Sequence, residues 1–311
     1  MKRLAISLAR NVGHAAMAPL EGQLMRAKPD RALPPVFIIG APRSGTSLLY
    51  ELLITRFRFA YMANAAHRFY RTPLAATRLF QGAIGKWEGN FTSRYGHIDG
   101  WGAPNEGGWI WQRWLADGDW TDGRDYPEPS IAELRQLTAG FTAVLDAPFL
   151  NKNVMHSNRL RLMQRIWPDA LYIEVRRDIR DNARSIIRAE RSEGGPEKHG
   201  DIWWSVRPRL AADYAGKSDS ERAVAQVIGV ARDIAEDMAI IDQGRLFSID
   251  YADMCAAPAK ALGEMEQFLA AHGYSLQQRL EVPEHFPVRP SKPLSDADEA
   301  VLTQTIEALA Q

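Results

Sequence analysis

Residues 36–49 read VFIIGAPRSGTSLL, an apolar run that leads into a turn rich in glycine and hydroxyl side chains. The run Val36–Ile39 is β-branched and aromatic, which is typical of a buried strand. Gly40 and Gly45 bound the turn, and a helix is predicted to begin near Ser47. Strand, loop and helix in this order form a phosphate cradle, in which loop amides and the helix N-terminus point at an anion. We therefore predict an anion-binding loop.

The spacing of the two glycines matches a Walker phosphate loop, but the residue types differ. Thr46 stands where that loop requires a lysine that reaches the β- and γ-phosphates of ATP. Arg43 is the only cation in the loop, and its guanidinium is a fixed fork of donors that suits an anion. The hydroxyls of Ser44, Thr46 and Ser47 add further donors. The loop is therefore suited to holding a phosphate and poorly suited to hydrolysing ATP.

A second segment with the features of an anion site follows later in the chain. Residues 170–188 read ALYIEVRRDIRDNARSIIR. Leu171–Val175 is predicted to be a short strand, and the helix after it carries Asp181 near the positive end of its dipole. Arg177 follows the strand, and Ser185 lies about two helical turns further on. This places an arginine and a hydroxyl where both can close on a second phosphate.

The segment that contains this second site carries an excess of positive charge. Lys152–Arg191 carries ten Lys and Arg against five Asp and Glu, whereas the whole chain has 38 of each kind and no formal net charge. A locally basic face in a neutral protein favours a small polyanion over bulk nucleic acid. A solvated arginine-rich helix is the alternative interpretation, and no nucleic-acid partner is expected.

Length and composition indicate one ordinary globular α/β domain. The 311 residues, 46% hydrophobic and 24% charged, suffice for an ample core. Strands are expected at 36–39, 57–62, 149–151, 171–175 and 246–249, with helices between them, which favours a mainly parallel sheet flanked by helices. The polar stretch Ser192–His199 is a candidate lid. We predict a single domain over residues 1–311.

The cysteine content and the N-terminus bear on the compartment. A single cysteine, Cys255, excludes an intrachain disulfide, lacks a ligand-like partner and suits a cytoplasmic protein. No apolar run approaches the roughly 20 residues that span a bilayer, and Arg10 and His14 interrupt the pattern of a signal peptide. Residues 1–33 are expected to form a helical extension. It either covers the core or contacts a membrane surface peripherally, near lipid-linked acceptors.

The two anion segments resemble the sulfotransferases that use 3′-phosphoadenosine 5′-phosphosulfate (PAPS). Residues 42–47, PRSGTS, are similar to the family's 5′-phosphosulfate loop, Pro-(Lys/Arg)-Ser-Gly-Thr-(Thr/Ser). Arg177 and Ser185 match its 3′-phosphate motif, within the pattern RDxRDxxxS. Further blocks that look like bacterial members cover 36–53, 100–111, 151–191 and 246–273. The resemblance implies a P-loop-NTPase-like sulfotransferase fold and PAPS as co-substrate, without a metal.

The resemblance also implies roles for individual residues. Arg43, Ser44, Gly45, Thr46 and Ser47 would bind the 5′-phosphosulfate, and Arg177 and Ser185 the 3′-phosphate. Arg43 and Lys152 would stabilise the negative charge of the leaving group.

The general base has two candidates. Glu106, in the loop APNEGGW, looks like the Pro-x-Glu element of bacterial relatives. The stretch 62–67, where other relatives carry an acid, contains none, and His67 is the second candidate because histidine titrates near neutral pH. His97 and His156 are weaker candidates for the same role.

The predicted activity is transfer of a sulfuryl group to a hydroxyl of a small molecule, a glycan or a glycolipid. Five tryptophans lie around Glu106, and some of them could form a platform for a sugar ring: Trp101, Trp109, Trp111, Trp114 and Trp120. Two alternatives stay open. One is a P-loop-like kinase or nucleotide phosphotransferase, and the other is a nucleotide-binding protein that has lost its base.

Overall fold

The strands of the protein form one parallel sheet. The computed structural model describes residues 2–29, 33–92, 98–116, 119–194, 203–288 and 290–310. Within them, four strands pair in the order β2-β1-β3-β4, and every neighbouring pair is parallel. The strands are β1 Val36–Ile39, β2 Leu150–Lys152, β3 Leu171–Arg176 and β4 Leu246–Asp250. The prediction of an α/β fold with a mainly parallel sheet is confirmed.

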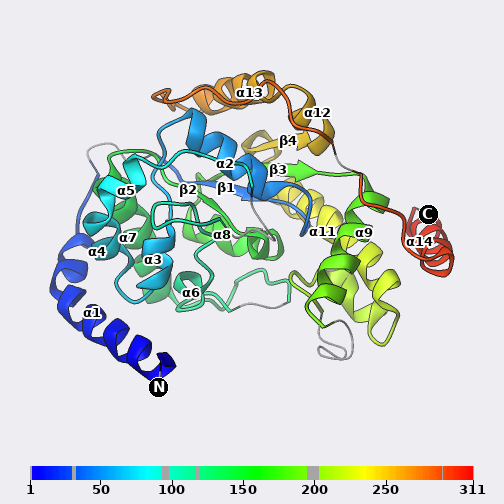
Figure 1. The fold of residues 1–311 in the computed structure, drawn as a ribbon, viewed down its shortest axis with the longest axis horizontal. Helices are drawn as coiled ribbons and strands as arrows, with labels where there is room; N and C mark the ends of the chain where they lie inside the picture. The colour runs from blue at the N-terminus through cyan, green and yellow to red at the C-terminus, as the bar shows by residue number, and fades with distance from the viewer. Residues whose placement is uncertain are drawn as a thin grey trace.

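Helices cover both faces of the sheet. Figure 1 shows α2 and α13 on one side of the strands and α8 on the other. The α-helices are α1 Lys2–Leu24, α2 Thr46–Arg56, α3 Asn64–Arg68, α4 Pro73–Leu79, α5 Gln81–Gly85, α6 Gly108–Trp111, α7 Glu128–Leu145, α8 Leu160–Ile166, α9 Ile179–Ser192, α11 Asp219–Ile241, α12 Tyr251–Ala256, α13 Pro258–Ala271 and α14 Asp296–Leu309. Short 3₁₀ helices are η1 Val154–Asn158, η2 Arg209–Tyr214 and η3 Gln243–Arg245.

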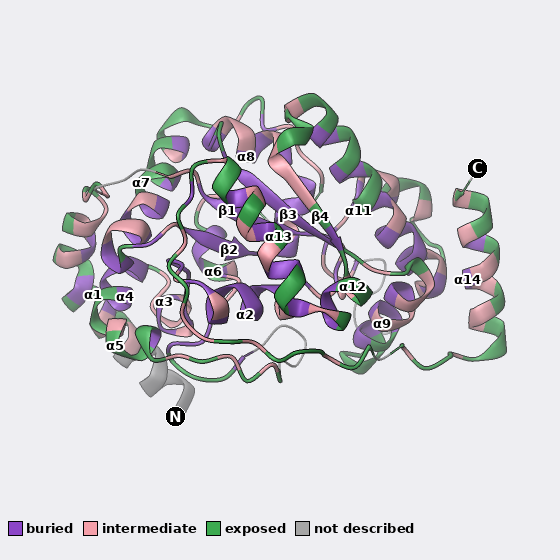
Figure 2. Ribbon diagram, turned by 90° about the horizontal axis from the view of Figure 1, so that it is seen from above, coloured by how far each residue is buried: buried purple, intermediate pink, exposed green. Residues whose placement is uncertain are grey.

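The sheet lies in the middle of the core. All four residues of β1 are 0% exposed, and Figure 2 shows the strands among buried elements. A strand that is covered on both faces reads as a continuous apolar run, which explains the sequence VFII. The single cysteine, Cys255, is buried as well.

Helix α1 packs against α4 at one end of the molecule (Figure 1). His14, Met17 and Glu21, spaced on one helical face, are buried. The Nδ1 of His14 lies 3.1 Å from the Oγ1 of Thr72, and the Glu21 carboxylate accepts a hydrogen bond from the Ala75 amide at 2.8 Å. The second half of α1 therefore covers the domain. No helix in the described ranges is both long and apolar enough to cross a bilayer.

The prediction of a strand at residues 57–62 is wrong. Phe57 forms an isolated antiparallel bridge with Gln278, and Ala60 forms an isolated parallel bridge with Phe149. The two bridges go to different segments, so no ladder extends along the stretch. Of the candidate lid, Ser192 ends α9, and residues 195–199 lie outside the described residues.

The topology brings the predicted site residues to one edge of the sheet. Because the strands are parallel, their carboxyl ends share an edge, and β1 lies between β2 and β3. The chain leaves β1 at a point where the strand order changes direction, which is where open α/β sheets bind ligands. The loop after β1, Lys152 at the end of β2 and Arg177 just after β3 therefore lie together.

Candidate active site

The loop between β1 and α2 has a backbone that favours glycine at two positions. At Gly40, where φ is +142°, a Cβ atom would lie 2.7 Å from the carbonyl oxygen of Val175. At Gly45, where φ is +108°, a Cβ atom would lie 2.4 Å from the ring of Tyr251. Arg43 also has a positive φ of 64°, which is uncommon for a residue with a side chain. The loop is therefore a tight backbone turn in which Gly40 and Gly45 leave no room for a side chain.

The second predicted segment holds this loop in place. The Nη1 of Arg177 donates a hydrogen bond to the carbonyl oxygen of Arg43 at 3.0 Å, and the Nε of Arg43 donates one to the Oγ of Ser185 at 3.3 Å. The side-chain amide of Asn182 donates to the carbonyl oxygen of Pro42 at 2.8 Å. The two segments that the sequence predicts to bind anions are thus joined to each other by hydrogen bonds.

Arg177 is oriented by two further contacts. Its Nε and Nη2 donate to the Oδ2 of Asp181 at 2.9 and 2.5 Å, and its guanidinium lies 4.8 Å from the centre of the Tyr251 ring. Burial raises the pKa of Tyr251 to about 12, so its hydroxyl stays neutral at neutral pH. The arginine is held as a fixed donor rather than a mobile surface charge.

Lys152 and Glu106 form an ion pair beside the loop. Lys152 is 4% exposed; its Nζ donates to the Oγ of Ser47 at 3.1 Å and pairs with the Oε1 of Glu106. The backbone oxygen of Glu106 accepts a hydrogen bond at 3.0 Å from the indole of Trp111, and the side-chain amide of Asn151 donates to it at 3.4 Å. The base candidate is therefore held by hydrogen bonds to its backbone, while its side chain is one-third exposed.

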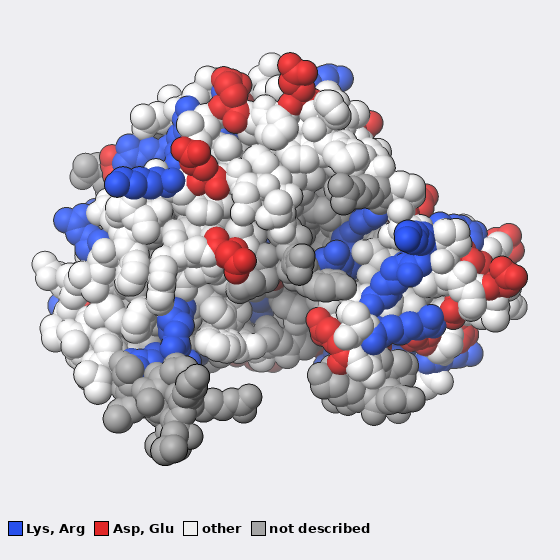
Figure 3. Space-filling view, viewed as in Figure 1, with Lys and Arg blue, Asp and Glu red and all other residues white. Residues whose placement is uncertain are grey.

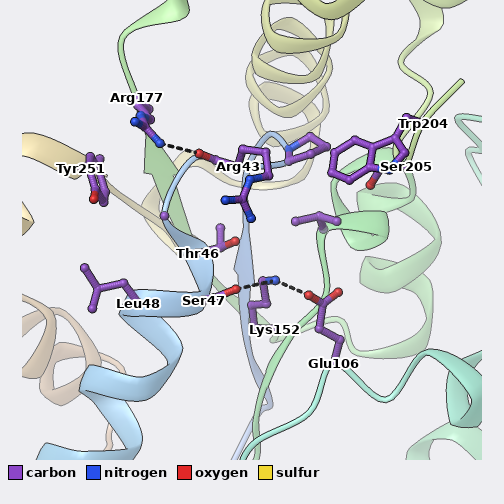
Figure 4. Close-up of a pocket in the computed structure, with 13 residues that line it drawn as sticks. Arg43, Thr46, Ser47, Leu48, Glu106, Lys152, Arg177, Trp204, Ser205 and Tyr251 are labelled. Atoms are coloured by element: carbon purple, nitrogen blue, oxygen red, sulfur yellow. Dashed lines mark hydrogen bonds and ion pairs between the residues drawn. The ribbon is translucent and has the colours of Figure 1, made fainter. Parts of the chain in front are cut away.

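These groups line one cavity of about 320 Å³, and Figure 4 draws its lining side chains as sticks. On the outer surface, Figure 3 shows Lys and Arg side chains at a hollow in the middle of the molecule. The lining residues that carry the cavity's chemistry are Arg43, Gly45, Thr46, Ser47, Glu106, Lys152, Arg177, Trp204, Ser205 and Tyr251.

The last three of these lining residues were not among the predicted site residues. Tyr251 directly follows β4, so the parallel sheet alone could have placed it at this edge. Trp204 and Ser205 come from the segment after α9 and carry no motif that marks them.

Other predicted residues lie elsewhere. The hydroxyl of Ser44 is buried and faces a neighbouring cavity, and Ser185 meets the loop through Arg43. His67 lines a separate groove, stacked on Trp109 with ring centres 4.6 Å apart. His156 is fully buried, and burial lowers its pKa well below the ordinary value. His97 lies outside the described residues.

The fold is a P-loop-like α/β fold, and arginine, lysine and hydroxyl side chains line a cavity at the carboxyl ends of its parallel strands. The chain belongs to the sulfotransferase family, whose sequence model matches residues 34–272. No curated protein sequence matches the chain significantly. Among the described residues, no group of three or more His, Cys, Asp or Glu side chains is placed to hold a metal ion.

Two solved structures with a similar fold are sulfotransferases of mycobacteria. Sulfotransferase STF9 from Mycobacterium avium superposes with a TM-score of 0.53 at 15% identity, over 96% of this chain and 73% of that one. STF1 from Mycobacterium tuberculosis gives a TM-score of 0.51 at 14% identity, over 94% of this chain and 75% of that one. At such low identity these likenesses establish the fold, and they confirm the P-loop-like sulfotransferase fold expected from the sequence.

Proposed function

We propose that the protein transfers the sulfuryl group of PAPS to a hydroxyl of a carbohydrate or glycolipid acceptor. The observation that carries this proposal is the contact between Arg177 and Arg43, which makes one binding unit of two anion segments. A donor with phosphates at two separate positions matches such a unit. Thr46 in place of a Walker lysine speaks against a kinase.

The residues present fit the donor. The left-handed Gly45 against the Tyr251 ring leaves the loop amides as a cradle without a side chain in the way. When bound, PAPS would supply the sulfuryl group for transfer.

The donor's two anionic ends would be held by different residues. Arg43, with the hydroxyl groups of Thr46 and Ser47, would hold the 5′-phosphosulfate. Arg177 and Ser185 would hold the 3′-phosphate. Arginine suits both positions because its fork of donors matches phosphate and sulfate oxygens.

The ion pair supplies the remaining chemistry. Lys152 presents a buried positive charge beside Ser47, where negative charge on the departing phosphate needs a counter-charge. Glu106 presents a carboxylate oxygen in the same cavity, where it can accept the proton of the attacking hydroxyl. His67 does not line the cavity proposed for the sulfuryl donor, whereas Glu106 does, so we place the base at Glu106.

Two variants test the assignment of the base. Glu106→Gln keeps the shape of the side chain, and we expect it to lower kcat by about 10²–10⁴-fold. The affinity for adenosine 3′,5′-bisphosphate, measured by calorimetry, should change little. His67→Gln should retain kcat. Sulfation of a panel of oligosaccharides with radiolabelled PAPS measures both, and turnover that survives Glu106→Gln but not His67→Gln would reverse the assignment.

The proposed location is the cytoplasm, where PAPS-dependent transfer would take place on a soluble or lipid-linked acceptor. The support is the single buried cysteine, Cys255, which suits a reducing compartment. A thiol titration of the folded and the unfolded protein tests whether this thiol is reduced and shielded.

A further inference from the structure

A second groove lies beside the candidate base. It has a volume of about 510 Å³, and its lining includes His67, Arg68, Trp101, Asn105 and Trp109. Asn105 lines this groove, and the next residue, Glu106, lines the active-site cavity. Consecutive residues of one loop therefore line the groove and the active-site cavity, with the candidate base on the cavity side.

The groove presents two exposed indoles. Trp101 is 51% exposed and Trp109 is 46% exposed, although large aromatic side chains are normally buried in a monomer. Each indole is supported by another ring: Trp101 stacks on Phe80 at 5.0 Å between ring centres, and Trp109 stacks on His67 at 4.6 Å. Fixed, solvent-facing indoles offer flat apolar surfaces on which the C–H face of a sugar ring can stack.

Four arginines line the groove or lie close to Trp109 or to Tyr70, whose ring centre is 5.9 Å from that of Trp109. Arg68 lines the groove, and Arg10 of α1 lies 5.9 Å from the centre of the Trp109 ring. Arg71 lies 5.7 Å from the Tyr70 ring, and Arg113 donates to the Tyr70 carbonyl oxygen. On the face seen in Figure 3, basic side chains gather at the end of the molecule where Figure 1 places α1, α3 and α6.

These four arginines form no ion pair with a carboxylate among the residues that the structure describes. Among the described residues, none of the four arginines has a carboxylate oxygen within 4.0 Å, in contrast to the paired arginines of α9. Glu21 and Glu133 act on Arg113 only from further away, and Asp99 adds one acidic group to the groove. Burial, followed by the charges of these arginines, lowers the pKa of His14. The groove therefore combines stacking surfaces with a positive potential.

We propose that this groove binds the acceptor, and that the acceptor is a carbohydrate carrying acidic groups. The proposal rests on the proposed function, since it places the acceptor hydroxyl next to Glu106. The indoles would stack on the sugar rings, and Arg68 and Arg10 would attract a carboxylate, phosphate or sulfate on a neighbouring position. An anionic membrane surface is the competing ligand, and it serves as an outcome of the test.

Two hexasaccharides of equal length provide the probes. Hyaluronan hexasaccharide carries a glucuronate in every second ring, and chitohexaose is neutral. Saturation-transfer NMR and calorimetry should show the acidic glycan binding at least about fivefold more tightly, with an affinity that falls as salt rises. Trp109→Ala and Trp101→Ala should weaken both glycans about tenfold or more. Arg68→Gln should remove only the preference for the acidic one.

Matched controls separate this proposal from the proposed function. Ile240→Ala removes an exposed apolar side chain of α11, and Lys260→Gln removes an exposed charge of α13; both should bind glycans like wild type. All variants should bind adenosine 3′,5′-bisphosphate equally, because the donor cavity is untouched.

If the nucleotide binds but neither glycan does, or if the tryptophan variants bind glycans normally, the acceptor proposal is overturned while the donor site stands. Binding of phosphatidylglycerol vesicles that is lost in the same variants, without glycan binding, assigns the groove to lipid and also overturns it.

Discussion

The guanidinium of Arg177 donates a hydrogen bond of 3.0 Å to the carbonyl oxygen of Arg43, 134 residues earlier in the chain. The donor side chain follows β3, and the acceptor, Arg43, lies in the loop after β1 with a positive φ of 64°. Since β1 and β3 are neighbours in the sheet, the contact couples the shape of the anion loop to the second anion segment. The two segments are therefore one connected structure, and a change in either of them should affect the other.

Gly45→Ala should disrupt the loop. A Cβ atom there would lie 2.4 Å from the Tyr251 ring, at a φ of +108° that side chains rarely adopt. We expect a loss of about 1–3 kcal/mol in unfolding free energy and a loss of nucleotide binding.

Gly263→Ala is the matched control, because nothing lies within 4 Å of the added Cβ in α13. It should be neutral or stabilise by up to about 1 kcal/mol. Urea denaturation measures both, and equal effects would contradict the described loop.

Lys152→Gln should separate turnover from folding. Removal of the buried ammonium leaves the Glu106 carboxylate and Ser47 without their shared partner. We expect kcat to fall by about 10²–10³-fold, because the charge that stabilises the leaving group is lost. The affinity for adenosine 3′,5′-bisphosphate should fall far less. Lys260→Gln, on exposed α13, is the control for loss of one lysine. Retained kcat in a folded Lys152→Gln protein would remove the lysine from the mechanism.

The buried carboxyl group of Glu51 should make the free energy of unfolding depend on pH. Its side chain, in α2, is 0% exposed; the carboxylate accepts one hydrogen bond, from the Phe91 amide at 3.0 Å, and burial raises its pKa from 4.5 to about 7. Since the folded-state pKa exceeds the unfolded one, the folded state binds more protons between these values. The contribution of Glu51 to the free energy of unfolding is therefore fully present below pH 4.5 and is lost as the pH rises through 7.

Glu51→Gln removes this titration and keeps an acceptor for the Phe91 amide. Relative to wild type, the variant should gain about 2–3 kcal/mol in unfolding free energy between pH 5 and pH 8. Groups common to both proteins cancel in this comparison. Urea titrations at the two pH values measure the difference. A constant difference between the two proteins would show that Glu51 does not carry the effect.

Much of the site was predictable because its motifs are local. Residues 42–47 and the pair Arg177 and Ser185 each follow a strand that reads plainly as buried, and parallel pairing brings such loops together. The same logic placed Lys152 at the end of β2. Within these segments, residue type and position determine the chemistry without long-range information.

Other features depend on contacts that no local pattern encodes. Residues 57–62 are apolar enough for a strand, but single bridges to Gln278 and Phe149 replace a ladder. The sequence left Glu106 and His67 as alternative bases, and only the packing of the loop around Trp111 turns the glutamate toward Lys152. Trp204 enters the cavity from a segment remote in sequence.

Calorimetric titration of adenosine 3′,5′-bisphosphate tests whether the cavity is a PAPS site. Wild type should bind it more tightly than Mg²⁺-ATP, and Arg177→Ala should weaken it by about 10–100-fold, as expected for loss of charge-assisted hydrogen bonds. Arg180→Gln, whose partner Glu299 keeps its pair with Arg184, should bind like wild type. Binding that is indifferent to Arg177, or a preference for Mg²⁺-ATP, would contradict the account of this cavity as a PAPS site.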